Sequence, residues 1–272
     1  MKKIITKEQE EIVIYNYTTL NKGLKSAGKE FNFSDNIVKK ILLKNNIPIR
    51  SVGGQRKFLV DDNYFKNQSS NMAYILGFWA ADGNVSSTEN RLDLELASVD
   101  IDILEKILAE IKSERPIKSY RCENGYTKNK LLFWSSKIKS DFIKYGIVPN
   151  KTYSKDFSMP YELDKKYWID YIRGFFDGDG SITKNQYSIA FHLNSVNYSF
   201  LETIKIFLKE YYNITTNIST TGMKNRNIPM YRLYCYSDEV KKIFDILYTP
   251  NSLFLIRKHE KWIELLKWKN LI

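Results

Sequence analysis

The sequence predicts an α+β chain in which a small all-α unit precedes two tandem repeats of the order helix-strand-strand-helix-strand-strand-helix. Three observations predict it. One helical segment occurs twice at a fixed spacing, segments alternating apolar and polar residues follow each copy, and the N-terminal part contains only helical patterns. The expected regions are 1–50 (trihelical domain), 51–68 (linker), 69–165 (first repeat) and 166–272 (second repeat).

Residues 1–50 are expected to form three helices. Residues 7–17 and 20–31 are the first two candidates, and Ser34 with Asp35 caps a third that runs to about residue 45. This is helix-turn-helix spacing, and the segment resembles the trihelical modules of resolvases and regulators. A plain three-helix packing unit is the alternative. As a DNA-binding module, its third helix would present Asn36, Lys39, Lys40 and Lys44.

A flexible basic linker is expected next. It contains Gly53-Gly54 and would lie along a DNA backbone or in a minor groove through Arg50, Arg56 and Lys57. Residues 1–70 hold thirteen Lys and Arg against seven Asp and Glu, a charge of +6.

The duplicated segment spans residues 74–85 and 171–182, with six identical positions at an offset of 97. Each copy is an apolar helix with two small residues one turn apart, so two such helices could pack with their backbones nearly touching. The small residues are Gly77 and Ala81 in the first copy, and Gly174 and Gly178 in the second.

Each copy ends in an aspartate, Asp82 or Asp179, followed by a helix-ending glycine. Close packing would bring both carboxylates to two helix C-termini, where the helix dipole repels anions. Their mutual repulsion at about 4 Å is roughly 4 kcal/mol at an effective dielectric near 20. A shared Mg²⁺, with Mn²⁺ as a substitute, would relieve both conflicts, using the carboxylates, water and the carbonyls of Ala81 and Gly178. A single Gly-Asp-Gly is ordinarily only a helix cap and turn, but duplication in register favours a site.

Residues 92–98 and 189–195 alternate apolar and polar side chains at the same offset, which predicts strands with one core face. The other face would read DNA bases, although a solvated sheet face has the same pattern. Its candidate DNA contacts, with one from the later strand 231–236, are Arg91, Glu95, His192, Asn194 and Arg232.

The remaining elements repeat as well. Helices are expected at 101–111 and 200–211, clear strands at 131–135 and 231–236, and closing helices at 137–145 and 238–248. Both repeats end in Pro-Asn. Helices on one side of each antiparallel sheet would leave the other side free.

Composition agrees with a nucleic-acid partner. The chain has 272 residues, a net charge of +11 and 43% hydrophobic residues, which suits several domains and a broad polyanion-binding surface. Surplus lysine can also be only a solubilising coat. Cys122 and Cys235 form no CxxC pair, and no stretch reaches membrane-spanning length, so we expect no membrane association and no secretion. The expected location is intracellular: the cytoplasm of a bacterium or phage-infected cell, or an organelle.

The duplicated helices resemble the signature helices of LAGLIDADG homing endonucleases. The resemblance to that family covers roughly residues 69–272. The resemblance implies two tandem αββαββα repeats forming a pseudo-symmetric saddle of antiparallel sheets, with Asp82 and Asp179 as metal-binding catalytic residues. It also implies polar and lysine residues around the metal. One departure is Ala80, which stands where Asp177 and the family pattern carry an earlier acid. Candidates for the supporting roles, which are equally ordinary surface residues, are Ser98, Ser195, Lys139 and Lys241.

The function that the resemblance implies is Mg²⁺-dependent, site-specific hydrolysis of both strands of double-stranded DNA. Unlike polar faces in the two repeats predict a monomer with a long, pseudo-asymmetric target. Two alternatives stay open. One is a non-cleaving helix-turn-helix transcription regulator on the same scaffold, and the other is an RNA maturase whose partner would be intron RNA.

Overall fold

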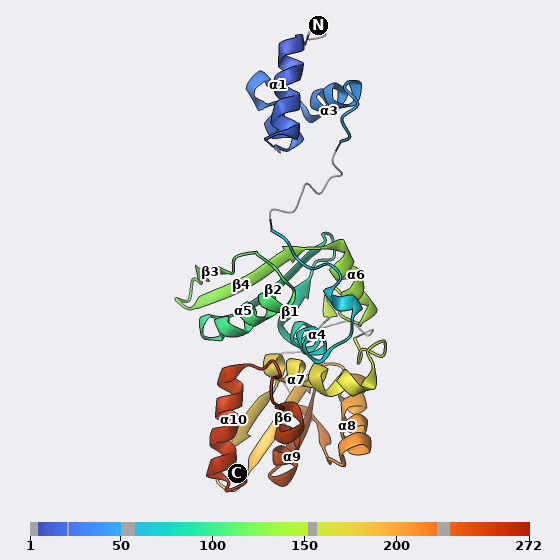
Figure 1. The fold of residues 1–272 in the computed structure, drawn as a ribbon. Helices are drawn as coiled ribbons and strands as arrows, with labels where there is room; N and C mark the ends of the chain where they lie inside the picture. Colours follow the sequence, from blue (N-terminus) through green and yellow to red (C-terminus); the bar gives the residue numbers. More distant parts are fainter. Residues whose placement is uncertain (1–4, 21, 50–57, 152–156, 222–228) are drawn as a thin grey trace. The chain divides into compact units, whose positions relative to one another are not determined.

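A computed structural model of the chain describes residues 5–20, 22–49, 58–151, 157–221 and 229–272 (Figure 1). The chain forms two units, Met1–Lys57 and Phe58–Ile272. None of the described helices is both long and apolar enough to cross a membrane. Three predicted DNA contacts lie outside the described residues, namely Arg50, Arg56 and Lys57.

The N-terminal unit packs three helices around one apolar core. They are α1 (Lys7–Thr18), α2 (Leu24–Ala27) and α3 (Asp35–Lys44). The second helix is shorter than the predicted 20–31, because Gly28 ends it and Lys29–Phe31 form a separate 3-10 turn, η1. A Cβ at Gly28 would lie only 2.6 Å from Cγ2 of Val38, so the glycine lets this turn pack closely against α3.

The larger unit carries both repeats. The first consists of α4 (Ser70–Asp82), β1 (Gly83–Val85), β2 (Arg91–Ala97), α5 (Ile101–Glu110), β3 (Lys118–Arg121), β4 (Thr127–Trp134) and α6 (Ser136–Lys144). The second consists of α7 (Trp168–Asp179), β5 (Ser181–Lys184), β6 (Ile189–Ser195), α8 (Tyr198–Tyr212), β7 (Asn217–Thr221), β8 (Met230–Tyr236) and α9 (Asp238–Leu247). The predicted α+β class and the element order of both repeats are confirmed. A further helix, α10 (Ile256–Trp268), follows the second repeat and was not expected.

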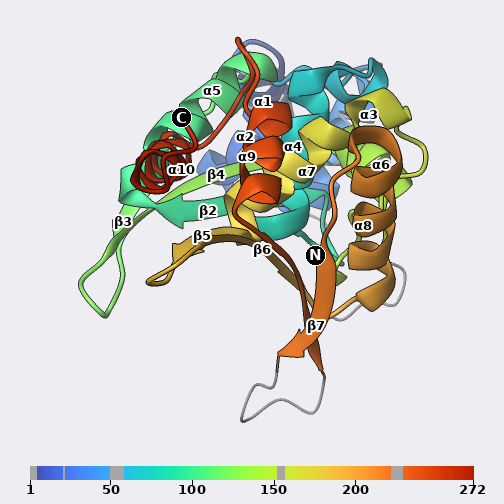
Figure 2. The same ribbon diagram turned by 90° about the horizontal axis from the view of Figure 1, so that it is seen from below.

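Each repeat folds its strands into one antiparallel sheet, in the orders β1-β2-β4-β3 and β5-β6-β8-β7. The helices lie on one side, and the sheets curve along the other (Figure 2). On β2 the side chains of Leu92, Leu94 and Leu96 are buried, as the alternation predicted. The open side of the sheets is therefore the surface left for a partner.

Helices α4 and α7 lie side by side between the two sheets (Figure 1). In α4 each residue from 72 to 80 is buried, because one side packs on its own sheet and the other on α7. Such a helix is apolar on all sides, unlike a surface helix with a single apolar stripe. One continuous core thus joins the two repeats.

Residues 58–68 belong to the first repeat rather than to the linker, so the predicted linker 51–68 extends too far. The Asp61 N–H donates to the Ile111 carbonyl (2.9 Å), and the Phe65 ring is buried edge-on against Phe142. The Ser135 hydroxyl also bonds Asp62. Residues 58–68 are therefore packed against the first repeat.

Candidate active site

The seam between α4 and α7 is as tight as the duplicated glycines predicted. A Cβ at Gly77 would lie 1.9 Å from the Tyr171 carbonyl oxygen, and a Cβ at Gly174 would lie 2.0 Å from the Tyr74 carbonyl oxygen. Real Cβ atoms do not approach so closely, so only glycine fits at both positions. The reciprocal contacts fix the rotation and the height of one helix against the other.

The same packing brings the two helix ends together. A Cβ at Gly178 would lie 2.3 Å from Cβ of Ala81 and 3.2 Å from a carboxylate oxygen of Asp82. Asp82 and Asp179 are the last residues of α4 and α7, and both side chains remain exposed to solvent. The seam therefore places two accessible carboxylates at adjoining helix ends.

The pKa values of both carboxylates are raised by their surroundings. Partial burial in the surrounding protein and then the nearby charge of Asp179 raise the pKa of Asp82 to about 6. Burial also raises the pKa of Asp179, and Lys151 and Lys258 oppose that shift. Both aspartates thus hold their negative charge less readily than an isolated aspartate, which is the conflict that a shared cation would relieve.

Two lysines that the sequence did not single out lie beside the carboxylates. Lys258, near the start of α10, donates to the carbonyls of Phe176 (2.7 Å), Gly178 (3.1 Å) and Gly180 (2.6 Å) at the end of α7. Lys151 bonds the Gly83 carbonyl at the end of α4. Each repeat therefore supplies one lysine to the carbonyls at its own helix end.

Burial lowers the pKa of Lys258 to about 8, against the opposing charges of Asp177 and Asp82. Burial also lowers the pKa of Lys151, against Asp179 and Asp82. A weak sequence signal existed for Lys151, which directly follows the Pro-Asn pair ending at Asn150, whereas Lys258 comes seven residues after the pair ending at Asn251. Both asparagines have a left-handed backbone (φ 56° and 63°). The pairs marked the ends of the repeats but not the lysines.

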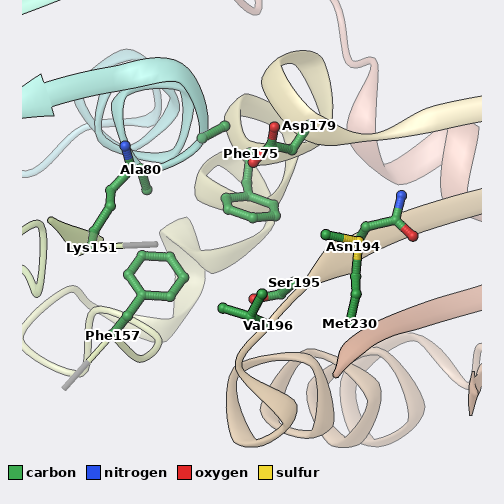
Figure 3. A pocket seen from close by; sticks show the side chains of 10 residues that line it. Ala80, Lys151, Phe157, Phe175, Asp179, Asn194, Ser195, Val196 and Met230 are labelled. Carbon is green, nitrogen blue, oxygen red and sulfur yellow. The ribbon is translucent and has the colours of Figure 1, made fainter. Parts of the chain in front are cut away.

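Two cavities flank the carboxylates. One, of about 380 Å³, is lined by Lys151, Asp179, Asn194 and Ser195 together with apolar residues. In Figure 3, Lys151 reaches it from the segment after the first repeat, Asp179 from the end of α7, and Asn194 with Ser195 from the end of β6. The other, of about 430 Å³, is lined by Asp82 and again by Lys151. Each carboxylate thus opens into its own cavity.

The residues at the site are suited to a hard divalent cation, but they would supply only some of its ligands. Within the described ranges, no group of three or more His, Cys, Asp and Glu side chains could hold a metal. Asp82 and Asp179 would therefore need oxygen ligands from the backbone, water or a bound phosphate, a set that suits Mg²⁺. Of the predicted backbone ligands, Ala81 lines both cavities, and the Gly178 carbonyl already accepts a bond from Lys258.

The supporting residues are only partly gathered at the site. Ser195 lines the first cavity, whereas Ser98 is exposed at the start of a 3-10 turn. Lys139 donates to the Glu89 carbonyl (2.7 Å), and Lys241 pairs with Asp245 on its own helix. The lysines found beside the carboxylates are Lys151 and Lys258 instead, because the segments after the closing helices return to the seam while these closing-helix lysines bind elsewhere.

The sheet residues predicted to contact DNA pair with polar neighbours within the protein. Arg91 pairs with Glu89 and Asp93, and Glu95 pairs with Lys128 (3.0 Å). In the second repeat, His192 Nε2 lies 3.0 Å from the Thr183 hydroxyl, and Arg232 donates to Asn194 (3.1 Å). The two sheets therefore present different chemistry: the first carries a network of acid–base ion pairs, and the second carries an arginine, Arg232, bonded to an uncharged amide.

Helix α3 displays most of its predicted contacts. Asn36 and Lys40 are exposed, and Lys39 is half-buried. Lys44 pairs with Glu10 of α1 at 2.7 Å, so part of its charge is already satisfied within the unit.

Asp177, the earlier acid of the second repeat, is held inside the protein by hydrogen bonds. Asp177 is buried and accepts hydrogen bonds from the hydroxyls of Tyr74 and Tyr248 and from the Leu255 N–H. Burial raises its pKa to about 6, and these bonds oppose the shift. Ala80 takes the equivalent place in the first repeat, so the seam is asymmetric two residues before the carboxylates.

The larger unit thus contains two αββαββα repeats that meet at a glycine-packed helix seam, with one carboxylate at each helix end. Residues 169–248 match the family described as LAGLIDADG-like domain, which confirms the predicted resemblance in the second repeat.

The relatives compared with the chain share less than 30% of their residues with it. An uncharacterized protein of Methanocaldococcus jannaschii is 29% identical over 156 residues, covering 55% of this chain and 56% of that protein. The chain thus spans about half the length of this curated relative. The solved N-terminal LAGLIDADG domain of DUF199/WhiA has a TM-score of 0.42 at 18% identity, covering 70% of this chain and 91% of that one.

Two solved nucleases are similar at the same level. Meganuclease I-SmaMI bound to uncleaveable DNA has a TM-score of 0.48 at 12% identity, covering 74% of this chain and 90% of that one. The LAGLIDADG homing endonuclease I-LtrWI bound to target DNA has a TM-score of 0.49 at 13% identity, covering 77% and 91%.

Proposed function

We propose that the chain is a divalent-cation-dependent endonuclease that hydrolyses both strands of double-stranded DNA at a specific site. The observation that carries the proposal is the pair of solvent-accessible carboxylates, Asp82 and Asp179, at adjoining helix ends with a cavity beside each. The family match in the second repeat and the overall charge of +11 support a polyanionic substrate. One carboxylate in each repeat suits one cut in each strand.

Asp82 and Asp179 would hold the cation, with Mg²⁺ the expected ion and Mn²⁺ a substitute. When bound, it would polarise the scissile phosphate and lower the pKa of the attacking water. In the reaction, the water oxygen bonds to phosphorus, the bond from phosphorus to the 3′ oxygen breaks, and the products are a 5′ phosphate and a 3′ hydroxyl. Water loses a proton to the surrounding solvent, and the leaving 3′ oxygen gains one.

Lys151 and Lys258 supply positive charge beside the reacting groups. Negative charge grows on the phosphate oxygens and on the 3′ oxygen during the attack, and a fixed cation in a partly dehydrated cavity stabilises that charge most strongly. Ser195 and Asn194, which line the same cavity as Lys151, are placed to orient water or phosphate by hydrogen bonding.

Binding would use the open side of the two sheets. The ion-pair network around Glu95 and the positively charged Arg232–Asn194 pair present unlike donors and acceptors to the two halves of a target. We therefore infer a single chain on a long, non-palindromic site. The N-terminal unit would add accessory phosphate and base contacts through α3, as a helix-turn-helix module.

The test is cleavage of DNA with the full-length protein. Candidate substrates are the DNA that flanks the gene's insertion point and a plasmid library with randomised inserts. We expect double-strand cuts at one sequence with Mg²⁺ or Mn²⁺ and none with EDTA.

Specific DNA binding without cutting under both metals would overturn the nuclease proposal and support the regulator alternative. Splicing of an intron RNA only in the presence of the protein, without DNA cutting, would support the maturase alternative.

A further inference from the structure

Helix α7 contains a buried arginine that the proposed reaction does not use. Arg173 is completely buried, and its guanidinium forms an ion pair with Asp170 (2.8 Å) and lies 5.3 Å from the centre of the Tyr74 ring. At the offset of 97 the first repeat has Leu76, which is buried as well. Leucine therefore suffices for packing at this position, and burial of a charged arginine is unfavourable unless its N–H groups are bonded.

The bonds that distinguish Arg173 from a leucine hold the turn between α9 and α10. Residues 248–255, which we call the connecting segment, join these two helices. Arg173 Nε donates to the Leu253 carbonyl (2.8 Å), and Nη1 donates to the carbonyl of Leu247, the last residue of α9 (2.9 Å). The arginine therefore ties the start and the later part of this turn to one point on α7.

Asp177, four residues further along α7, holds the same segment by accepting hydrogen bonds. Its carboxylate accepts from the Tyr248 hydroxyl (2.9 Å) and from the Leu255 N–H (2.7 Å). Arg173 and Asp177 thus bond the connecting segment as donor and acceptor, and we call these two residues the bracket. The first repeat has Ala80 in place of Asp177, so it carries neither half of this pair.

The connecting segment ends where the helix with the active-site lysine begins. Leu255 is the N-cap residue of α10, and Lys258 lies in the first turn of that helix. The Leu255 side chain makes no capping bond, so its own N–H on Asp177 is the contact that fixes the start of α10. The Lys258 ammonium then reaches three carbonyls at the end of α7. A shift of the connecting segment would therefore move this ammonium away from those carbonyls and from the carboxylates beside them.

We propose that Arg173 and Asp177 are positioning residues that set Lys258 beside the paired carboxylates. They act through the connecting segment and the first turn of α10. The inference rests on the proposed nuclease function, in which Lys258 stabilises charge on the reacting phosphate, and extends it to two buried residues that do not touch the substrate. Loosening the bracket therefore slows the chemical step and leaves DNA binding intact.

Two conservative variants loosen the bracket with little change of volume. Arg173→Lys keeps a positive charge for Asp170, but one ammonium lacks the planar fork that reaches two carbonyls. Asp177→Asn replaces one of the two accepting oxygens with a donor. Tyr171→Phe is the matched control, because this buried residue lies on the same helix and its hydroxyl has no hydrogen-bond partner in the described part of the chain.

The first measurement is the single-turnover rate of cutting of a bound target duplex, with full-length protein and Mg²⁺. We expect each bracket variant to slow cutting by about 10- to 100-fold at unchanged DNA affinity, since small misplacements at a reacting centre have effects of this size. Tyr171→Phe should cut as the unmodified protein does. Lys258→Met should slow cutting at least as much as either bracket variant. Combining it with a bracket variant should slow cutting no further, because both changes act through one ammonium, whereas independent losses multiply.

The second measurement follows the lysine without any cleavage. Brief acetylation with N-hydroxysuccinimidyl acetate, read by mass spectrometry, reports how accessible the Lys258 amine is. It should be labelled slowly in the unmodified protein, where three carbonyls hold it, and faster in both bracket variants. Exposed Lys40 is the reference, and its labelling should be the same in every variant.

Unchanged cutting by both bracket variants, losses that multiply with that of Lys258→Met, or unchanged labelling of Lys258 would each overturn the inference and leave the bracket a purely structural role. Absence of cutting by the unmodified protein at its bound site would overturn the proposed function instead. The labelling then still decides whether the bracket holds Lys258 in place.

Discussion

The Tyr74 hydroxyl donates a 2.9 Å hydrogen bond to the Asp177 carboxylate across the helix seam. Tyr171, its equivalent at the offset of 97, has a buried hydroxyl with no hydrogen-bond partner in the described part of the chain. The reason is visible in the sequence, because Ala80 replaces the acid that would face Tyr171 by pseudo-symmetry. The hydrogen bond between Tyr74 and Asp177 therefore has no counterpart at Tyr171 in the other half of the seam.

This asymmetry predicts opposite effects of the same substitution. Tyr74→Phe leaves the buried Asp177 with one donor fewer and should lower the free energy of unfolding by about 1.5–3 kcal/mol. Tyr171→Phe removes a hydroxyl that has no partner and should leave stability unchanged or raise it. Urea unfolding of the two variants measures this difference. An equal loss in both would show that Tyr171 has a partner in solution.

The glycine seam predicts a second contrast. Gly77→Ala or Gly174→Ala places a Cβ about 2 Å from a backbone oxygen, so α4 and α7 must move apart. Overpacking of this kind costs about 1–3 kcal/mol or more, and here it also separates the carboxylates. Gly23→Ala is the control, since a Cβ there meets nothing within 4 Å.

Thermal unfolding and metal-dependent cleavage together report this effect. If the two seam variants unfold and cut as the control does, the helices do not pack as closely in solution as described.

The third prediction concerns the carboxylates themselves. Asp82→Asn and Asp179→Asn each remove one anionic ligand but no basic surface, so each should abolish double-strand cleavage and leave DNA affinity nearly unchanged. Cleavage assays and gel shifts at matched salt separate the two effects. Near-normal cutting by both single variants would show that the reaction takes place elsewhere.

The free energy of unfolding should depend on both pH and Mg²⁺, because both act on the two carboxylates. The pKa of Asp82 is about 6 in the folded protein against an ordinary 3.8, so the folded state binds this proton more tightly than the unfolded state. Its contribution to stability is therefore present below pH 3.8 and is lost as the pH rises through about 6. Asp179 contributes with the same sign, because its pKa is also raised.

A cation that binds the ionised pair reverses this loss, so Mg²⁺ should raise the melting temperature more at pH about 7.5 than at pH about 5. Asp177 also titrates near this range, so the comparison is made with Asp82→Asn, in which Asp177 is unchanged. The Mg²⁺ effect should shrink in that variant at both pH values. An equal Mg²⁺ effect in the variant and the unmodified protein would place the ion elsewhere.

The sequence predicted the parts of the site that local pattern controls. Gly77, Gly174 and the two terminal aspartates were found because the duplication repeats them in register, and alternation of apolar residues located the central strands. Lys151 and Lys258 were not found, since they are two among forty-two Lys and Arg and only the return of the chain to the seam brings them near the carboxylates. Helix α10 and the packing of residues 58–68 were also not predicted, because they too depend on contacts between segments far apart in the sequence.

The final prediction separates the N-terminal unit from the chemistry. Deleting residues 1–57 removes the N-terminal unit but leaves Phe65 and the bonds of residues 58–68 that complete the first repeat. We expect the shortened protein to keep its cut site and cleavage, to bind more weakly and to protect less DNA at one end. Each lost phosphate contact should make the slope of log affinity against log salt shallower by about 0.9.

A second deletion, of residues 1–66, is the matched comparison. It also removes Phe65, whose ring packs edge-on against Phe142 with 4.7 Å between ring centres, so it should lower the melting temperature as well as the affinity. Footprinting and a salt series on the 1–57 deletion are decisive for the N-terminal unit. Unchanged footprint and salt slope would show that its three helices pack together without touching the target, whatever the charge on α3.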